Sequence, residues 1–537
     1  MEGVRFTVVA DLPALRQARH EFGGASFKIH QAVIDRHGAG IDAGAGGIQL
    51  RVEVLRRALR AIHQRARACR GAGGEGGERQ RRDRVLANHR NSFMFFISCQ
   101  RILILRHFIN NIKITTQTPD NTNKEGSTMP SPLGSQLTRR FFRYLAITSQ
   151  SDASATMLPS TPGQHEMARA LADELQTLGL THVVIDEHAT VTAVKKGTVP
   201  GAPRIGFITH IDTVDVGLSP EIHPQILTFT GEDLCLNARE DIWLRVAERP
   251  EITAYPNEEI IFSDGTSVLG ADNKAAVTVV MTLLENLTPE MRHGDIVVAF
   301  VPDEEIGLRG AKALDLARFD VDFAYTIDCC ELGEVVYENF NAAQAEIRFT
   351  GVTAHPMASK GVLVNPLLMA TDFISHFDRQ ETPEHTAGRE GYVWFNGMQA
   401  SQNSATLNAS IRDFDLQAFE RRKQQLHDVA EKIAAAHPTA KVELTISDVY
   451  SNISNAIGDD RRPIDLIYQA LEALDIAPKT IPMRGGTDGA ALSAKGLLTP
   501  NFFTGAHNFH SRFEFLPVKS FEASYNVALK ICLLAAA

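Results

Sequence analysis

Short, uninterrupted runs of apolar residues constrain the fold of this chain more than any other feature. They occupy residues 183–185, 205–209, 296–301 and 323–327. Runs of this kind are typical of strands that are buried on both faces of a sheet. A helical pattern over residues 274–287 lies between two of them. Strands that alternate with helices in this way predict an α/β fold, with a mixed sheet and helices on both of its faces.

The start and end of one helix can be read residue by residue. Thr161, Pro162 and Gln164 match an N-cap, a proline at the first helical position and a capping-box glutamine. Gly179 supplies the glycine that commonly ends a helix. Between these signals, apolar residues recur along one helical face, namely Met167, Leu171, Leu175 and Leu178.

Residues 335–448 have the pattern of a second, smaller unit, which we call the inserted domain. The signals are, in order, a strand, a helix, two strands, a helix and a strand, at residues 345–349, 366–377, 391–398, 404–411, 416–437 and 442–446. This order is that of a ferredoxin-like α+β fold. Strand and helix signals of the α/β kind resume after residue 450. The inserted domain is therefore predicted to interrupt a catalytic domain made of residues 129–334 and 449–537.

Residues 1–128 differ from the rest in charge and pattern. They carry 21 basic and 11 acidic side chains, a net charge of +10, whereas the remaining chain carries 33 basic and 53 acidic ones, a net charge of −20. A basic tail for nucleic acid or membrane and a transit peptide are alternatives, although acidic residues are frequent for a transit peptide. We favour an extension without function. A chain that begins at Met129 is then expected to fold and to be fully active.

Charge and composition exclude several classes of protein for the main body. Its acidic balance argues against nucleic-acid binding. No stretch of about 18 apolar residues is free of charge, since the best one, residues 93–112, contains Arg101 and Arg106, so we expect no membrane span. The six cysteines form no CxxC pair, which argues against a disulfide framework or a zinc ribbon and suits a reducing cytoplasm.

Acidic and imidazole side chains follow the predicted strands at several separate places. His210 and Asp212 come after the strand at residues 205–209, and their spacing by two would point both to one side of an extended chain. Ligands of open α/β sheets bind beyond the carboxyl ends of the strands, so such positions are predicted to converge. The other members of this set are Asp272, Asp303, Glu304, Glu305, Asp328 and His510.

Each of these signals is weak when taken alone. A histidine and an aspartate spaced by two usually lie in a surface loop, or the histidine is buried with its hydrogen bonds satisfied. An Asp-Glu-Glu run usually forms a solvated turn. Their coincidence after buried apolar runs favours a shared site. Imidazole and carboxylate ligands suit Zn²⁺ and related divalent ions. A carboxylate between two ions is the usual arrangement for two-metal hydrolysis.

Seven motifs, taken together and in order, carry a resemblance to a known family. They are Thr-His-Ile-Asp-Thr (209–213), Leu-Gly-Ala-Asp-Asn-Lys-Ala (269–275), Pro-Asp-Glu-Glu-Ile-Gly (302–307), Thr-Ala-His-Pro (353–356), Ile-Arg-Asp-Phe-Asp (411–415), Arg-Gly-Gly-Thr-Asp-Gly (484–489) and Phe-His-Ser-Arg-Phe-Glu-Phe (509–515). Over nearly all of residues 129–537, the chain resembles the tripeptide aminopeptidases of the dinuclear-zinc metallopeptidase family. That family also contains aminoacylases and glutamate carboxypeptidases, and it has no counterpart of residues 1–128.

The resemblance implies two Zn²⁺ ions in each subunit, bridged by an aspartate and by a water or hydroxide. One ion would be held by His210, Asp272 and Asp328, and the other by Asp272, Glu305 and His510. Asp272 is then the bridging residue. Asp212 would accept the N–H of His210 and fix its tautomer.

The same resemblance assigns roles in catalysis and in substrate binding. Glu304 would be the general base that takes a proton from the attacking water and later protonates the leaving amine. His355, in the inserted domain, would stabilise the oxyanion when that domain closes as a lid, in several relatives across a dimer. Arg412 would bind the C-terminal carboxylate of the substrate. Arg484 would assist near the mouth of the site or, alternatively, form an ion pair with Asp488.

These assignments predict a cytoplasmic zinc aminopeptidase that releases the N-terminal residue of tripeptides. Its expected partners are small peptides, and we expect it to bind neither nucleic acid nor a membrane. One alternative is the same fold acting on another amide, such as a dipeptide or an N-acyl amino acid. A second alternative is a non-catalytic binding or dimerisation module, against which the complete ligand set and Glu304 argue. The inserted domain is the expected contact of a homodimer, and the sequence leaves the oligomeric state open.

Overall fold

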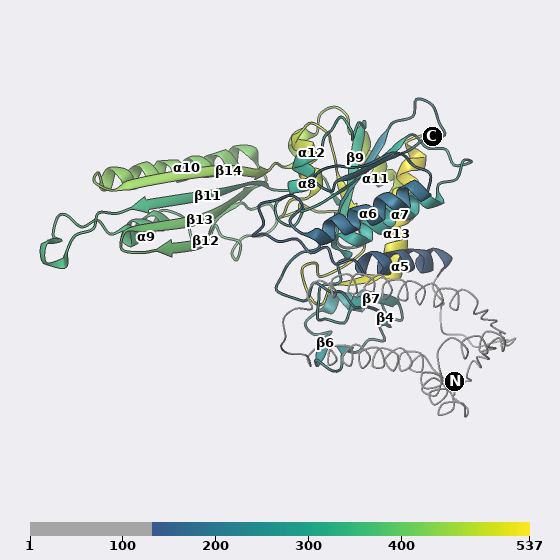
Figure 1. Cartoon of the computed structure of the whole chain (residues 1–537), viewed down its shortest axis with the longest axis horizontal. Helices are drawn as coiled ribbons and strands as arrows, with labels where there is room; N and C mark the ends of the chain where they lie inside the picture. The colour runs from purple at the N-terminus through teal and green to yellow at the C-terminus, as the bar shows by residue number, and fades with distance from the viewer. Residues whose placement is uncertain (1–130) are drawn as a thin grey trace, which may run out of the picture. The chain divides into compact units, whose positions relative to one another are not determined.

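The computed structural model describes residues 131–537, and its largest element is an eight-stranded mixed sheet (Figure 1). The predictions for residues 1–128, including the apolar stretch at residues 93–112, lie outside the described residues. In spatial order, the strands of the sheet are β1 (Thr181–Ile185), β2 (Val191–Lys195), β8 (Ile296–Val301), β3 (Ile205–His210), β9 (Phe323–Cys329), β16 (Asn501–Phe503), β10 (Glu334–Val336) and β15 (Lys479–Thr480).

The centre of this sheet is parallel. β3 pairs in parallel with β8 on one side and with β9 on the other, and β16 continues the parallel part beside β9. Every residue of β3, β8 and β9 is buried, as expected for strands with helices on both faces. β2 and β10 add antiparallel neighbours, which makes the sheet mixed. The four apolar runs are therefore confirmed as strands, but the expected burial is wrong for residues 183–185, because β1 is the edge strand and Val184 and Ile185 are exposed.

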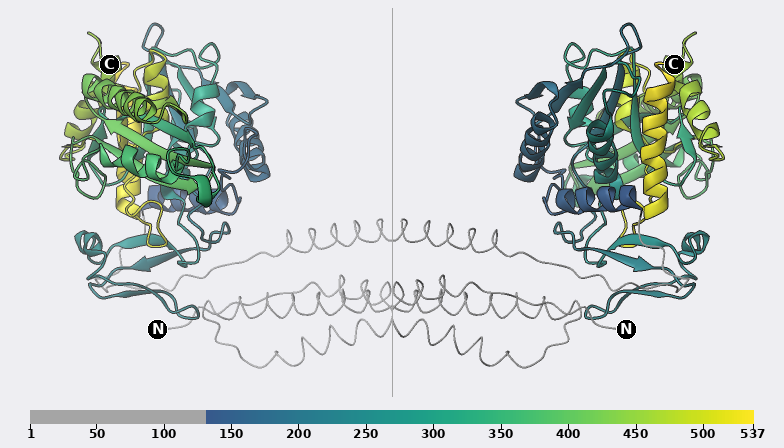
Figure 2. Two further views of the ribbon diagram at one scale, coloured as in Figure 1. Left: turned by 90° about the vertical axis from the view of Figure 1, so that its left-hand side faces the viewer. Right: turned by 90° about the vertical axis from the view of Figure 1, so that its right-hand side faces the viewer.

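Helices cover both faces of the sheet, as predicted. On one face, α7 (Ala271–Asn286) packs against β3 and β9 and against α5 (Pro132–Leu145) and α13 (Val518–Leu534), which also contact each other (Figure 2). On the other face, α8 (Arg309–Ala313) and α12 (Asp488–Ala494) share an apolar core with β3 and β9. None of the helices within residues 131–537 has the length and apolar composition needed to cross a membrane.

The predicted helix is α6 (Pro162–Thr177), with Thr161 as its N-cap and Gly179 at a φ of +75° just after its end. The role predicted for Gln164 is wrong, because the amide does not close a capping box. Its Nε2 donates to Asp303 Oδ1 at 2.6 Å, and its Oε1 accepts the backbone N–H of Asp303 at 3.0 Å. The glutamine therefore holds the turn that follows β8, 139 residues away.

The elements of the inserted domain have the ferredoxin-like order that the sequence predicts. Its antiparallel sheet has the spatial order β12-β13-β11-β14. Apolar residues of this sheet and of the two helices form a separate core. Its members include Ile347 from β11, Phe373 from α9 and Leu426 from α10. The bounds are β11 (Asn341–Thr350), α9 (Pro366–Ser375), β12 (Tyr392–Ala400), β13 (Ser404–Asp413), α10 (Leu416–Ala436) and β14 (Lys441–Tyr450).

Two small sheets were not predicted from the sequence. The first has the order β17-β7-β4 and the second pairs β5 with β6. Several of these strands are short and only half-buried, so they lack the continuous apolar run that reveals a central strand. The first sheet brings residues just after the predicted ligand His510 beside the segment that precedes α7. The bounds are β4 (Pro224–Thr228), β5 (Leu234–Asn237), β6 (Ile242–Leu244), β7 (Glu259–Ser263) and β17 (Phe515–Pro517).

Candidate metal centre

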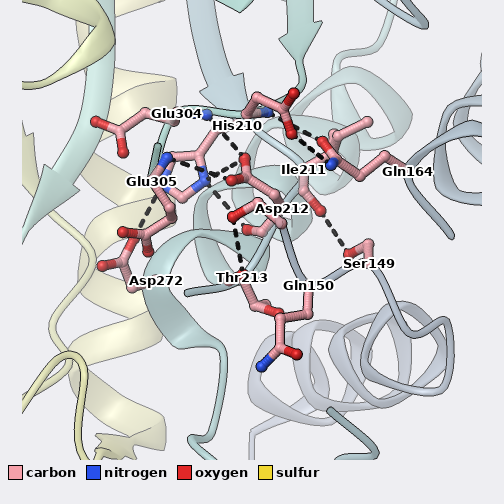
Figure 3. Close-up of polar contacts among 12 residues, drawn as sticks. Ser149, Gln150, Gln164, His210, Ile211, Asp212, Thr213, Asp272, Glu304 and Glu305 are labelled. Carbon is pink, nitrogen blue, oxygen red and sulfur yellow. Dashed lines mark hydrogen bonds and ion pairs between the residues drawn. The ribbon is translucent and has the colours of Figure 1, made fainter. Parts of the chain in front are cut away.

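Several of the side chains predicted from the sequence lie together at one edge of the large sheet, namely those of His210, Asp212, Asp272, Glu304 and Glu305 (Figure 3). His210 is the last residue of β3, and Asp328 lies near the end of β9. Glu304 and Glu305 follow β8, and Asp272 lies at the start of α7. Because β8, β3 and β9 are parallel neighbours, their carboxyl ends meet at the same edge. Segments that are far apart in the sequence thus deliver their side chains to one place.

The carboxylate of Asp272 lies between two imidazoles. Its Oδ1 is 3.0 Å from His210 Nε2, and its Oδ2 is 3.1 Å from His510 Nε2. The same nitrogen of His510 is 3.0 Å from Glu305 Oε2. One ligand atom each of His210, Asp272 and Glu305 lie within 4.8 Å of one another. A carboxylate that presents one oxygen to each of two such groups has the arrangement of a ligand that bridges two ions.

Asp212 fixes the orientation of His210. The imidazole Nδ1 lies 3.1 Å from the backbone oxygen of Asp212 and 3.3 Å from its Oδ1. A carbonyl oxygen can only accept, so Nδ1 carries a proton, and Nε2 is the ring nitrogen that faces Asp272 and could bind an ion. The carboxylate of Asp212 also accepts the backbone N–H groups of Glu304 at 3.1 Å and Glu305 at 3.2 Å. One buried aspartate therefore orients two segments of the site.

The turn that carries Glu304 and Glu305 is held from behind by Asp303. The backbone of Asp303 has a φ of +55°, in the left-handed region that residues with a side chain seldom adopt. Its buried carboxylate accepts the backbone N–H of Ser160 at 2.8 Å, the hydroxyl of Ser160 at 2.5 Å and the amide of Gln164 at 2.6 Å. Such a conformation persists where the surrounding hydrogen bonds over-determine it.

The buried carboxyl groups of the cluster repel one another. Burial is the main cause that raises the pKa of Glu304 and Asp328 well above the usual range and that of Glu305 to about 7. For Asp272, burial is outweighed by hydrogen bonds from His210 and His510, which hold its pKa below the usual range. Hydrogen bonds to Asp272 and Glu305 raise the pKa of His510 to about 11. Without a cation, the cluster therefore retains protons, as expected of a cation site.

An unpartnered oxygen supports the same interpretation. Glu305 Oε1 is buried and has no hydrogen-bond partner within residues 131–537. A buried oxygen without a partner is rare, because the group then bears its full desolvation penalty. Carboxylate and imidazole donors that converge in this way fit divalent ions such as Zn²⁺. The residues present therefore fit the metal centre that the resemblance implies.

Two buried acidic residues near the cluster received no role from the sequence. Glu514 accepts the backbone N–H groups of Gly270 at 2.8 Å and Asp272 at 3.0 Å, and so holds the loop that carries the central carboxylate. Asp488, the first residue of α12, was considered only as an ion-pair partner. Both lie inside motifs of the resemblance, at residues 484–489 and 509–515. The motifs mark these residues, but sequence spacing does not reveal which groups they face.

His355 and Arg412 do not contact the cluster through any hydrogen bond or ion pair in the described part of the chain. His355 is exposed in the inserted domain, and its Nδ1 accepts the backbone N–H of Met357 at 3.2 Å. Arg412, near the end of β13, donates to the backbone oxygens of Ala343 at 3.1 Å and Ile411 at 3.0 Å. Both residues belong to the part that is predicted to close over the substrate.

Arg484 binds the inserted domain, so the alternative of an ion pair with Asp488 is wrong. Both terminal nitrogens of its guanidinium are engaged by the segment between α9 and β12. Arg484 could therefore bind a substrate only by giving up these hydrogen bonds. The acceptors are the backbone oxygens of Gly388 at 3.1 Å and Glu390 at 2.9 Å and the hydroxyl of Thr386 at 2.7 Å.

Comparison with known proteins identifies the family. The model of peptidase family M20/M25/M40 matches residues 270–533. A peptidase T-like protein of Yersinia pestis is 70% identical over 408 residues, which are 76% of this chain and 100% of the relative. The chain belongs to peptidase family M20/M25/M40. Peptidase T of a Geobacillus species is 40% identical over 400 residues, which are 74% of this chain and 97% of that protein.

Membership in this family confirms the resemblance to peptidase T and the prediction of an enzyme that hydrolyses peptide bonds. Solved structures confirm the fold. A tripeptidase of Staphylococcus aureus has a TM-score of 0.60 at 22% identity, over 76% of this chain and 100% of its own. A dinuclear metal-binding peptidase of the M20 family from Bacillus subtilis has a TM-score of 0.50 at 16% identity, over 75% of this chain and 98% of its own.

Glu514→Gln is predicted to weaken metal binding, because the amide would turn one N–H₂ donor toward a backbone N–H and release the Asp272 loop. The free energy of unfolding should fall by about 1–3 kcal/mol, the cost of an unsatisfied buried group. Zinc affinity by chelator competition and urea unfolding provide the measurements. Glu174→Gln, in an ion-pair cluster on α6, is the control and should lose stability without losing zinc. Equal zinc affinity in both variants would contradict the role of Glu514.

Proposed function

We propose that this chain is a zinc aminopeptidase that removes the N-terminal residue of tripeptides. The observation that carries the proposal is the carboxylate of Asp272 between His210 and His510, with Glu305 beside them. The relatives support the substrate class, since they include proteins named peptidase T and a solved tripeptidase. The name of the Bacillus subtilis relative, a dinuclear metal-binding peptidase, supports two ions.

The ligand assignment from the resemblance is compatible with the observed geometry. Asn501 Oδ1 accepts the backbone N–H of Asp328 at 2.7 Å and thereby holds this ligand at the end of β9. When bound, the ions would polarise the peptide carbonyl and lower the pKa of a water between them. We assign one Zn²⁺ to His210, Asp272 and Asp328 and the other to Asp272, Glu305 and His510.

Glu304 is the general base of the proposed reaction. Its backbone N–H is held by Asp212, so the turn is fixed, and the charges of His210, Asp328 and Glu305 act on its buried carboxyl group. Burial raises the pKa of Glu304, which favours the protonated form. A carboxylate with a raised pKa is well suited to accept a proton from water and to deliver it to the leaving amine nitrogen. His355 would then stabilise the oxyanion when the inserted domain closes.

Arg412 is proposed to bind the C-terminal carboxylate of the substrate. A competing explanation for Arg412 is an ion pair with Asp413 or Asp415 in the same domain. Asp413 instead accepts Arg422 Nε at 2.8 Å, and Asp415 caps α10 by accepting the backbone N–H of Ala418 at 2.7 Å. The guanidinium of Arg412 is held only by backbone oxygens and by the ring of Tyr450, without a carboxylate partner in the described residues.

A cytoplasmic location is part of the proposal, and it is supported by the cysteines. All four that lie in the described part of the chain, Cys235, Cys329, Cys330 and Cys532, are free thiols. Free thiols of this kind suit a reducing compartment. The homodimer through the inserted domain stays a prediction.

A substrate panel tests the proposed activity directly. We expect the zinc-loaded protein to show its highest kcat/KM for tripeptides, with lower values for dipeptides, tetrapeptides and N-acetyl amino acids. Each kcat/KM is measured from initial rates of release of the free amino acid. A preference for N-acetyl amino acids or dipeptides would support the alternative amidohydrolase or dipeptidase instead.

Glu304→Gln is predicted to lower kcat by about 10²–10⁴-fold, because glutamine keeps the size of the side chain but cannot accept a proton. Zinc content should stay at the wild-type value, since Glu304 is not assigned as a ligand. Asp272→Asn should instead lose zinc, because it removes charge from the carboxylate shared by both ions. Initial rates and metal analysis of the two variants separate these roles. The same loss of zinc in both would refute the assignment of Glu304.

Arg412→Ala is predicted to lower kcat/KM for tripeptides by about tenfold to a hundredfold, the effect of losing one charge-assisted contact. It should also reduce the preference for tripeptides over their C-terminal amides. Initial rates on matched acid and amide substrates give the measurement. Arg348→Ala, an exposed arginine on β11, is the control and should leave the preference unchanged. If the wild type cleaves acid and amide equally well, Arg412 has no role in reading the carboxylate.

A further inference from the structure

Asp488 begins a helix that packs on the strands carrying His210 and Asp328. Its helix, α12, packs on β3 and β9 and shares a core with Ile208 and Ala324. Alternate residues of a strand face the same side, so His210 and Asp328 project from the sheet toward α12. A Cβ atom on Gly489, the next residue, would lie 3.4 Å from Thr326 Oγ1 of β9. The start of α12 is therefore placed two residues from Asp328 along that strand.

The carboxyl group of Asp488 has no partner of its own. Asp488 is 1% exposed, and both of its Oδ atoms are buried without a hydrogen bond in the described part of the chain. The groups whose charges interact with it include His210 and five carboxyl groups, those of Asp212, Asp272, Glu304, Glu305 and Asp328. Arg484, the cation nearby in sequence, is engaged by the inserted domain. All of these neighbours except His210 are acidic, so residues 131–537 supply no lysine or arginine that pairs with Asp488.

We propose that Asp488 is a positioning residue that supplies negative charge to the ion held by His210, without being one of its ligands. This inference rests on the proposed metal centre. A resident ion on His210 can act on Asp488 through the poorly polarisable interior. An ammonium group of a substrate would need an oxygen that it can touch, and both oxygens of Asp488 are covered by protein. The observed burial thus favours the ion over the substrate as the counter-charge.

The proposal has a consequence that a purely structural residue would not share. In the metal-free protein, the buried charge of Asp488 lies among like charges and should oppose folding. A neutral side chain at this position should therefore raise the thermal stability of the metal-free protein. The same change should weaken zinc binding, because the ion loses a neighbouring negative charge. The effects on metal-free stability and on zinc affinity are expected to have opposite signs.

The experiment uses the full chain with two neutral variants, Asp488→Asn and Asp488→Ser. If one variant does not fold, the other still tests the proposal. Zinc affinities are measured at neutral pH by competition with a chelating dye, and unfolding temperatures with and without Zn²⁺. We expect one of the two sites to bind zinc about 10- to 100-fold more weakly. The metal-free variants should unfold at a higher temperature than the metal-free wild type.

Asp413→Asn is the matched control. Asp413 is also a buried aspartate, but it is paired with Arg422 in the inserted domain. Its variant should lose stability and keep wild-type zinc affinity. Unchanged zinc affinity in both Asp488 variants would overturn the inference, and so would a lower unfolding temperature of their metal-free forms. Failure of the wild type to bind two ions would refute the metal centre itself, which is a distinguishable result.

Discussion

The concentration of buried negative charge at one edge of the large sheet is the constraint on which the site depends. Burial of a carboxylate is unfavourable unless hydrogen bonds or a cation compensate it. The carboxylate of Asp212 is compensated by two backbone N–H groups and by the ring nitrogen of His210 at 3.3 Å. Glu305 and Asp488 retain buried oxygens without partners in the described residues. The site is therefore complete only with cations, and the protein around it is organised to hold such charges close together.

The segments that carry the ligands are held by residues that lie far away in the sequence. Gln164 on α6 binds Asp303, which shapes the turn of Glu304 and Glu305. Glu514 binds the backbone of the Asp272 loop, 242 residues away. Gln164 belongs to a helix that packs on the large sheet, whereas Glu514 directly precedes β17 of the small three-stranded sheet. Both supports act through backbone hydrogen bonds on the segments whose side chains form the site.

The strands at the centre of the sheet could be predicted because burial on both faces requires continuous apolar runs, as in β8 and β9. The ferredoxin-like order of the inserted domain was equally readable from periodicity. The half-exposed strands of the small sheets, such as β4, were not predicted, because a short strand with polar residues looks like a loop. Gln164 was misread for a related reason, since its local pattern matched a cap while a distant partner captured the side chain.

The sequence by itself determined the α/β class, the family and the residues from which a metal centre can be built, because residue type and order along the chain carry that information. The tertiary structure alone decided which groups meet. It placed Asp272 between His210 and His510, and it turned Arg484 toward the inserted domain and away from Asp488. Hydrogen bonds between residues 62 to 238 positions apart depend on how the backbone folds, and no local pattern of side chains records that arrangement.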